Sequence, residues 1–144
     1  MFKPTVEVGE DVYNLRFQLM KEETEEYLQA CKDRDLVEIA DALGDQLYIL
    51  CGTILSHGLQ GVIDDIFNEI QNSNMSKLDL DGNPIYREDG KVLKGENYFK
   101  PDISKVLKNY KNYFLFIFSL QLKGSSILPY CISNNSFFNF SVIS

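Results

Sequence analysis

The chain is poor in the residues that bind zinc or build disulfide frameworks. Its 144 residues include a single histidine, His57, and three cysteines, Cys31, Cys51 and Cys131, an odd number without close spacing. This pattern excludes a disulfide scaffold and a zinc motif, and it favours a reduced, cytoplasmic setting. His57 precedes Gly58 where an apolar helical pattern stops, so a capping role is a better interpretation than a catalytic one.

Positive charge is also scarce. Fourteen Lys and Arg stand against 21 Asp and Glu, a net charge of −7, which argues against a nucleic-acid-binding surface. Residues 22–69 hold twelve acidic and two basic residues, whereas residues 77–108 hold seven basic ones. The start lacks a basic segment followed by an apolar one, so no secretory signal is evident. An acidic segment for metals and a basic segment for phosphates would suit a nucleotide polyphosphate.

Apolar periodicity predicts three helices followed by a long irregular segment. The expected helices cover about residues 10–32, 36–56 and 61–72. The expected core stripe of the second helix is Leu36, Ile39, Leu43, Leu47, Leu50 and Ile54. Residues 73–101 are rich in turn residues and predict a turn at 81–84 and a small hairpin at 85–93. We expect an all-α helical bundle with a small hairpin-containing loop after the third helix.

Carboxylates occupy helix positions that normally carry apolar side chains. They are Glu22, Glu23 and Glu26 in the first helix and Glu38, Asp41 and Asp45 in the second. Each group shares a helix side with apolar residues, and the second helix is apolar nearly all round. We therefore expect the acidic strip of the second helix to face protein, so that the two carboxylate rows meet across the helix pair.

Such rows need to be neutralised, by protonation of some carboxylates, by the arginines Arg16 and Arg34 that are near in sequence, or by a bound cation. Like charges at i,i+4 cost about 0.2 to 0.5 kcal/mol per pair even when exposed. Hard divalent cations take oxygen ligands, so an all-carboxylate site predicts Mg²⁺, with Mn²⁺ as an alternative, and not zinc. In the irregular segment, Asn74, Lys77, Lys91 and Lys94 are candidates for contacting phosphate or base. A solvated basic loop is the alternative for any one of them.

These motifs resemble the all-α, MazG-like nucleoside triphosphate pyrophosphohydrolases. The pattern E-E-x-x-E occurs at residues 22–26, and E-x-x-D follows at residues 38–41. The later runs N-S-N-M-S-K-L and D-G-N-P-I-Y-R-E-D-G-K-V-L-K-G-E-N-Y-F-K-P are similar to the branch often labelled phosphoribosyl-ATP pyrophosphohydrolase-like. The resemblance covers roughly residues 15–101. It implies cleavage between the α and β phosphates of a nucleoside triphosphate or related polyphosphate, giving the monophosphate and pyrophosphate.

The resemblance also implies roles for individual residues. The implied metal ligands are Glu23, Glu26, Glu38 and Asp41. Glu22 would bind a second metal or orient the attacking water. Asp45 would either contact the ligand residues without binding the metal or be an ordinary polar residue of the helix face. The implied partners are a nucleotide substrate and further copies of the chain, as a homodimer or homotetramer, without nucleic acid or membrane.

The two ends of the chain depart from the family pattern. Family members usually carry a further helix ahead of the E-E-x-x-E helix, but only 21 residues precede Glu22. We expect residues 1–105 to form the domain without that helix. Residues 103–144 lack acidic residues, and the apolar run at 113–122 has only ten residues, too few to cross a bilayer. Four alternatives stay open for 106–144: a buried element, a membrane-surface or partner-binding segment, a disordered tail and a non-native extension. We favour the non-native extension, because the resemblance stops near Pro101.

A rival hypothesis follows from the same departures. The chain would then be an inactive or truncated family member that acts as a helical dimerisation or binding module. Its acidic rows would be solvated helix faces, and its behaviour would not depend on divalent ions.

Overall fold

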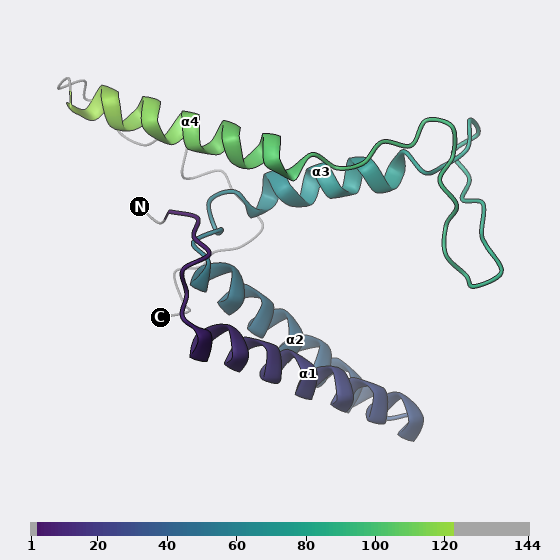
Figure 1. Cartoon of the computed structure of the whole chain (residues 1–144). Coiled ribbons are helices and arrows are strands. Elements are labelled where there is room, and N and C mark those ends of the chain that lie inside the picture. The colour runs from purple at the N-terminus through teal and green to yellow at the C-terminus, as the bar shows by residue number, and fades with distance from the viewer. Residues whose placement is uncertain (1–2, 123–144) are drawn as a thin grey trace. The chain divides into compact units, whose positions relative to one another are not determined.

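The computed structural model describes residues 3–122 of the chain as two units (Figure 1). Four helices are present: α1 (Glu10–Asp33), α2 (Leu36–Ser56), α3 (Ile63–Met75) and α4 (Ile103–Leu122). The first unit, residues 3–61, holds α1 and α2, and the second, which begins at Val62, holds α3 and α4. The all-α prediction is confirmed, because residues 3–122 contain no strand beyond one isolated bridge.

Local signals end α1 and start α2 close to the predicted positions. Arg34 follows α1 with φ 58° and ψ 33°, the left-handed conformation that commonly stops a helix. Asp35 then caps α2, because its Oδ1 accepts hydrogen bonds from the backbone N–H groups of Val37 at 2.9 Å and Glu38 at 3.2 Å. A two-residue link therefore reverses the chain.

The C-terminal end of α2 contacts Lys3 and Thr5, near the start of the described residues. His57 is the residue that caps α2, its carbonyl accepts the N–H of Thr5 at 2.9 Å, and its Nδ1 lies 3.0 Å from the carbonyl oxygen of Thr5. Gly58 has φ 66°, and a Cβ there would collide with the carbonyl oxygen of Lys3. The predicted capping role of His57 is confirmed.

The helices α1 and α2 lie side by side (Figure 1). Their buried residues are Ala30 in α1 and Ala42, Ile49 and Cys51 in α2. The side-chain amide of Gln46 in α2 donates to the backbone carbonyl oxygen of Glu23 in α1 at 3.2 Å.

The expected core stripe of α2 is wrong for its leucines, whereas Ile39 and Ile54 are half-buried. Its leucines are largely exposed, with exposed fractions of 76% for Leu36, 49% for Leu43, 49% for Leu47 and 47% for Leu50. A pair of helices covers only one side of each helix, and α2 turns the side with Ala42 and Ile49 inward. The expectation that the acidic strip faces protein is also wrong, since Glu38, Asp41 and Asp45 are exposed.

The second unit is held by contacts between α3 and the chain that returns along it (Figure 1). Ser73, only 3% exposed, donates its hydroxyl to the carbonyl oxygen of Phe99 at 2.8 Å. The N–H of Asp102 donates to Glu69 Oε1 at 2.8 Å, just before α4 starts and packs on α3. Val62, 1% exposed, is the largest fully buried side chain among the described residues.

The predicted hairpin after α3 is present, whereas the turn expected at 81–84 lies two residues earlier, at 79–82. Gly82, with φ 80°, donates its N–H to the carbonyl oxygen of Asp79 at 3.1 Å. Tyr86 and Val92 form an antiparallel bridge, flanked by a hydrogen bond from the N–H of Arg87 to the carbonyl oxygen of Lys91 at 2.8 Å. The hairpin register therefore sets residues 87 and 91 opposite each other.

The helix α4 crosses the expected domain boundary at residues 105 and 106. The first part of the expected tail is thus helical, whereas residues 123–144 lie outside the described residues. That residues 106–144 are a non-native extension stays a prediction. Among residues 3–122, none of the helices combines the length and apolarity that crossing a membrane requires.

Candidate functional site

The carboxylate of Glu23 lies where the acidic residues of α1 and α2 meet. It is half-buried, and its Oε2 is shielded from solvent without a hydrogen-bond partner among the described residues. Its position follows from the helix pairing, because the hydrogen bond from Gln46 places the backbone of Glu23 against the middle of α2.

The charge state of Glu23 reflects this crowding. Its pKa is raised above the ordinary value of 4.5, first by desolvation and then by the negative charges of Glu26, Asp45, Glu22 and Asp41. Two of these carboxylates come from α1 and two from α2. The expectation that the two rows meet across the helix pair is therefore met at this residue.

The predicted ligand residues differ in how closely they approach one another. Glu22, Glu26, Glu38 and Asp41 are exposed, and Glu38 is not among the groups that raise the pKa of Glu23. Within residues 3–122, no three His, Cys, Asp or Glu side chains are arranged closely enough to hold a metal ion. The set of metal ligands stays a prediction. The shielded carboxylate oxygen of Glu23 is the type of ligand that a hard cation prefers.

The sequence prediction did not place Asp45 or Arg16 among the metal ligands. Asp45 precedes Asp41 among the charges that raise the pKa of Glu23, and its place four residues after Asp41 was the available signal. Arg16 lies on α1 two turns before Glu23, and its Nε is buried without a hydrogen-bond partner in the described part of the chain. A Cβ at Gly52 of α2 would lie 2.9 Å from Nη1 of Arg16, so the glycine makes room for the guanidinium.

The four predicted substrate-binding residues come together in the second unit. Asn74, Lys77, Lys91 and Lys94 all line one cavity of about 650 Å³. The remaining lining residues are Leu78, Arg87, Val92 and Leu93. Lys77 Nζ donates to Asn74 Oδ1 at 2.7 Å, and Lys94 Nζ lies 4.5 Å from the centre of the Tyr98 ring. The described lining thus carries four cationic side chains and no carboxylate.

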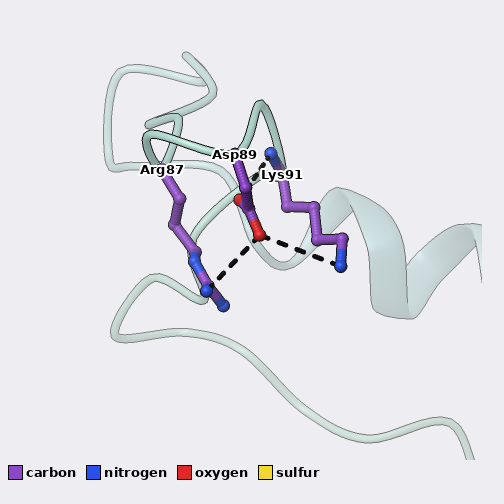
Figure 2. A network of polar contacts seen from close by, with 3 residues as sticks. All are labelled: Arg87, Asp89 and Lys91. Carbon is purple, nitrogen blue, oxygen red and sulfur yellow. Dashed lines mark hydrogen bonds and ion pairs between the residues drawn. The ribbon is translucent and has the colours of Figure 1, made fainter.

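Arg87 is the cationic lining residue that the sequence prediction missed. Figure 2 shows the carboxylate of Asp89 between the ends of Arg87 and Lys91. Asp89 Oδ2 lies 3.4 Å from Nη2 of Arg87 and 3.8 Å from Nζ of Lys91. The predicted hairpin was the available signal, because its register already set residues 87 and 91 opposite each other.

The family of the chain follows from a comparison with family models. The model described as phosphoribosyl-ATP pyrophosphohydrolase matches residues 3–74, which is half of the 144 residues. The chain belongs to the phosphoribosyl-ATP pyrophosphohydrolase family. No curated protein matches the chain.

Membership in the phosphoribosyl-ATP pyrophosphohydrolase family indicates a hydrolase of the pyrophosphohydrolase type that acts on a nucleotide-like substrate. The matched residues contain α1, α2 and nearly all of α3. All six acidic residues of the two predicted rows therefore lie inside the match: Glu22, Glu23, Glu26, Glu38, Asp41 and Asp45. Of the four predicted substrate-contacting residues, only Asn74 lies inside the match. The evidence that the other three form a binding site is therefore the geometry of the cavity and not the family match.

Proposed function

We propose that the protein is a metal-dependent nucleotide pyrophosphohydrolase that cleaves between the α and β phosphates of a nucleoside triphosphate or a related polyphosphate. The observation that carries the proposal is the crowding of Glu23 by carboxylates from both helices, in a chain of the phosphoribosyl-ATP pyrophosphohydrolase family. A solvent-shielded carboxylate oxygen with no protein partner is costly unless a cation or proton neutralises it.

The proposed metal ligands are Glu23, Glu26, Glu38 and Asp41, and Glu22 binds a second metal or orients the attacking water. When bound, Mg²⁺ or Mn²⁺ would supply Lewis-acid polarisation of phosphate oxygens and a more acidic water. The exposure of Glu38 and Asp41 leaves their oxygens accessible to cation and substrate. Asp45, which adds negative charge at Glu23, strengthens the attraction for cations.

Four further residues are proposed to contact the substrate, and all of them lie in the second unit. They share one cavity and contact the phosphates or the base: Asn74, Lys77, Lys91 and Lys94. Lys side chains bind phosphate as point charges. The carboxylates carry no information about the base. The cavity lies in an irregular, turn-rich segment, which suits a flexible lid that accepts several nucleotides. We therefore expect one or more standard or modified nucleoside or deoxynucleoside triphosphates as substrates. The first candidate to test is dUTP.

A nucleotide panel with and without divalent metal tests the reaction. Pyrophosphate and orthophosphate are scored separately, and we expect pyrophosphate with Mg²⁺ or Mn²⁺ and nothing with EDTA. Orthophosphate alone would assign the protein to another reaction class. No turnover of any nucleotide at millimolar Mn²⁺ would favour the rival hypothesis of a helical dimerisation module, which the exposed leucines of α2 support.

A substitution at the acidic strip tests the ligand assignment. Asp41→Asn keeps the size of the side chain, removes one charge and should lower turnover by at least about a hundredfold. The metal-free protein should fold as before, since Asp41 is exposed. Asp64→Asn, an acidic position in the first turn of α3, is the control and should keep wild-type turnover. Near wild-type activity of Asp41→Asn would remove Asp41 from the metal site.

A further inference from the structure

The cavity of the second unit has the composition of a site for a phosphorylated ligand. Four cationic side chains and one amide share its lining with three apolar side chains, Leu78, Val92 and Leu93. Its volume of about 650 Å³ falls within the range of about 300 to 1,000 Å³ that is usual for small-molecule sites. Cations can neutralise phosphates there while the apolar wall contacts an uncharged part of the ligand.

The cations differ in what already engages them. Lys77 faces the amide oxygen of Asn74 at 2.7 Å, and Lys94 lies over the Tyr98 ring, so both have electrically neutral partners. Arg87 and Lys91 share the single carboxylate of Asp89 (Figure 2). Among the described residues, Asp89 is thus the one anion paired with this group of four cations.

The geometry of the shared carboxylate indicates loose pairing. Its distances of 3.4 Å to Arg87 and 3.8 Å to Lys91 exceed the 2.7 to 2.9 Å of a strong charge-assisted hydrogen bond. The side chains of Arg87 and Lys91 are 58% and 77% exposed, and exposed ion pairs contribute little to stability. Both cations can therefore turn to an arriving anion at small cost.

We propose that Arg87 is a phosphate-binding residue of this cavity, and that Asp89 is an internal counter-anion that a phosphate of the ligand displaces from Arg87 and Lys91. The ligand class is the polyphosphate chain of a nucleotide. The identity of the ligand rests on the proposed function. This proposal adds to it the guanidinium of Arg87 and a carboxylate, that of Asp89, which competes with phosphate for Arg87 and Lys91. Arg87 offers a planar pair of donors that matches two phosphate oxygens, which no lysine provides.

Asp89 has a second role that makes a clean substitution possible. Its Oδ1 accepts the backbone N–H of Lys91 at 3.2 Å and supports the turn of the hairpin. Asn at this position keeps an oxygen for that hydrogen bond and removes the charge. Asp89→Asn should therefore preserve the hairpin while leaving Arg87 and Lys91 without their competing anion.

Binding of inorganic tripolyphosphate to the full chain, measured by calorimetry in EDTA, tests the proposal without any hydrolysis. We expect Arg87→Met to weaken binding about tenfold and Asp89→Asn to tighten it about threefold to tenfold, with a steeper dependence on salt. Lys100→Met removes one positive charge from the same segment outside the cavity lining and should change binding less than about twofold. Arg87→Lys should recover only part of the loss.

Several outcomes would overturn the proposal. Arg87→Met binding like Lys100→Met would show that Arg87 acts only through net charge, and weaker binding by Asp89→Asn would show that Asp89 is not a competitor. Tighter binding of a short oligonucleotide than of tripolyphosphate or a non-hydrolysable nucleoside triphosphate would assign the cavity to another ligand class. Loss of binding in Arg87→Met with no pyrophosphate release by the wild type would support this site and refute the proposed reaction, so the two failures are distinguishable.

Discussion

Glu23 combines partial burial with four negative neighbours, and both raise the pKa of its carboxyl group. A group whose pKa is higher in the folded than in the unfolded state binds a proton more tightly when folded. Without metal, the charged form of Glu23 therefore opposes folding. A bound cation reverses this effect, because it favours the charged form of Glu23 and binds only the folded state, which it therefore stabilises.

This linkage gives a prediction for metal-free protein. As pH rises above the ordinary value of 4.5 through the raised pKa, the free energy of unfolding should fall and then stay low. Glu23→Gln should remove this decrease and raise the melting temperature at pH 7 in EDTA, while abolishing any increase in melting temperature caused by Mg²⁺. Thermal melts from pH 4 to 8 measure both effects.

Glu25→Gln is the control for that experiment. Glu25 is an exposed residue of the same helix, with its side chain 68% exposed and 3.7 Å from Nζ of Lys21. Its substitution should leave the melting curves nearly unchanged, because exposed pairs of this kind contribute little. Equal pH dependence in wild type and Glu23→Gln would show that the crowding at Glu23 has no energetic consequence.

At the scale of helices, the sequence predicts where elements begin and end better than which face they bury. The ends of α2 depend on local signals, the cap at Asp35 and the left-handed Gly58, which a sequence displays directly. The buried face depends on the neighbour, and α2 is apolar nearly all round. The choice of Ala42 and Ile49 over the leucine stripe therefore could not be derived from periodicity.

The same distinction applies to the candidate site. The predicted hairpin is local, and with it Asn74, Lys77, Lys91 and Lys94 reach one cavity. Arg87 was missed because the prediction considered lysines singly and not the residue opposite Lys91. The crowding of Glu23 depends on the pairing of α1 with α2. The sequence motifs predicted this pairing but not how closely the carboxylates approach one another.

Two glycines of α2 give a matched test of the contact between α1 and α2. A Cβ at Gly44 would meet nothing within 4 Å, whereas a Cβ at Gly52 would approach Nη1 of Arg16 at 2.9 Å. Gly44→Ala should stabilise the protein by about 0.5 to 1 kcal/mol, the usual gain in a helix interior. Gly52→Ala should gain less, because the guanidinium must move.

Chemical denaturation of the two variants, alone and combined with Arg16→Met, measures this difference. In the Arg16→Met background Gly52→Ala should recover the full gain of Gly44→Ala. The coupling energy between positions 16 and 52 is then the direct measure of the contact. A gain for Gly52→Ala that does not depend on Arg16 would contradict the arrangement of these helices.

The helix α4 leads to a prediction about truncation. Its half-buried residues in the first two turns, Ile103, Val106, Leu107 and Tyr110, precede exposed positions such as Leu115, which is 54% exposed. A chain that ends at residue 110 should keep its melting temperature within a few degrees and be more soluble, because it loses exposed apolar side chains. A large loss of stability would show that the C-terminal residues form part of the core.

At the scale of the whole molecule, the pattern of exposure on α2 is unusual for an isolated chain. At 100° per residue, Leu36, Leu43, Leu47 and Leu50 lie on the side of the helix opposite Asp41. All four leucines are largely exposed, and on α1 Phe17 and Leu28 are 62% and 52% exposed. Exposed leucines gathered on one side of a helix, as on α2, mark an interaction surface. A partner on the leucine side would leave the carboxylates accessible.

We therefore expect the protein to associate with further copies of itself through the leucine side of α2. Sedimentation velocity across the micromolar range should show a dimer or tetramer, and Leu43→Glu combined with Leu47→Glu should give monomers. Burying each leucine contributes about 1.5 to 3 kcal/mol, and a glutamate there would instead bury a charge. Leu80→Glu, at a residue of the irregular segment that is 86% exposed, is the control and should keep the wild-type assembly. A wild-type monomer at high micromolar concentration would contradict the predicted self-association.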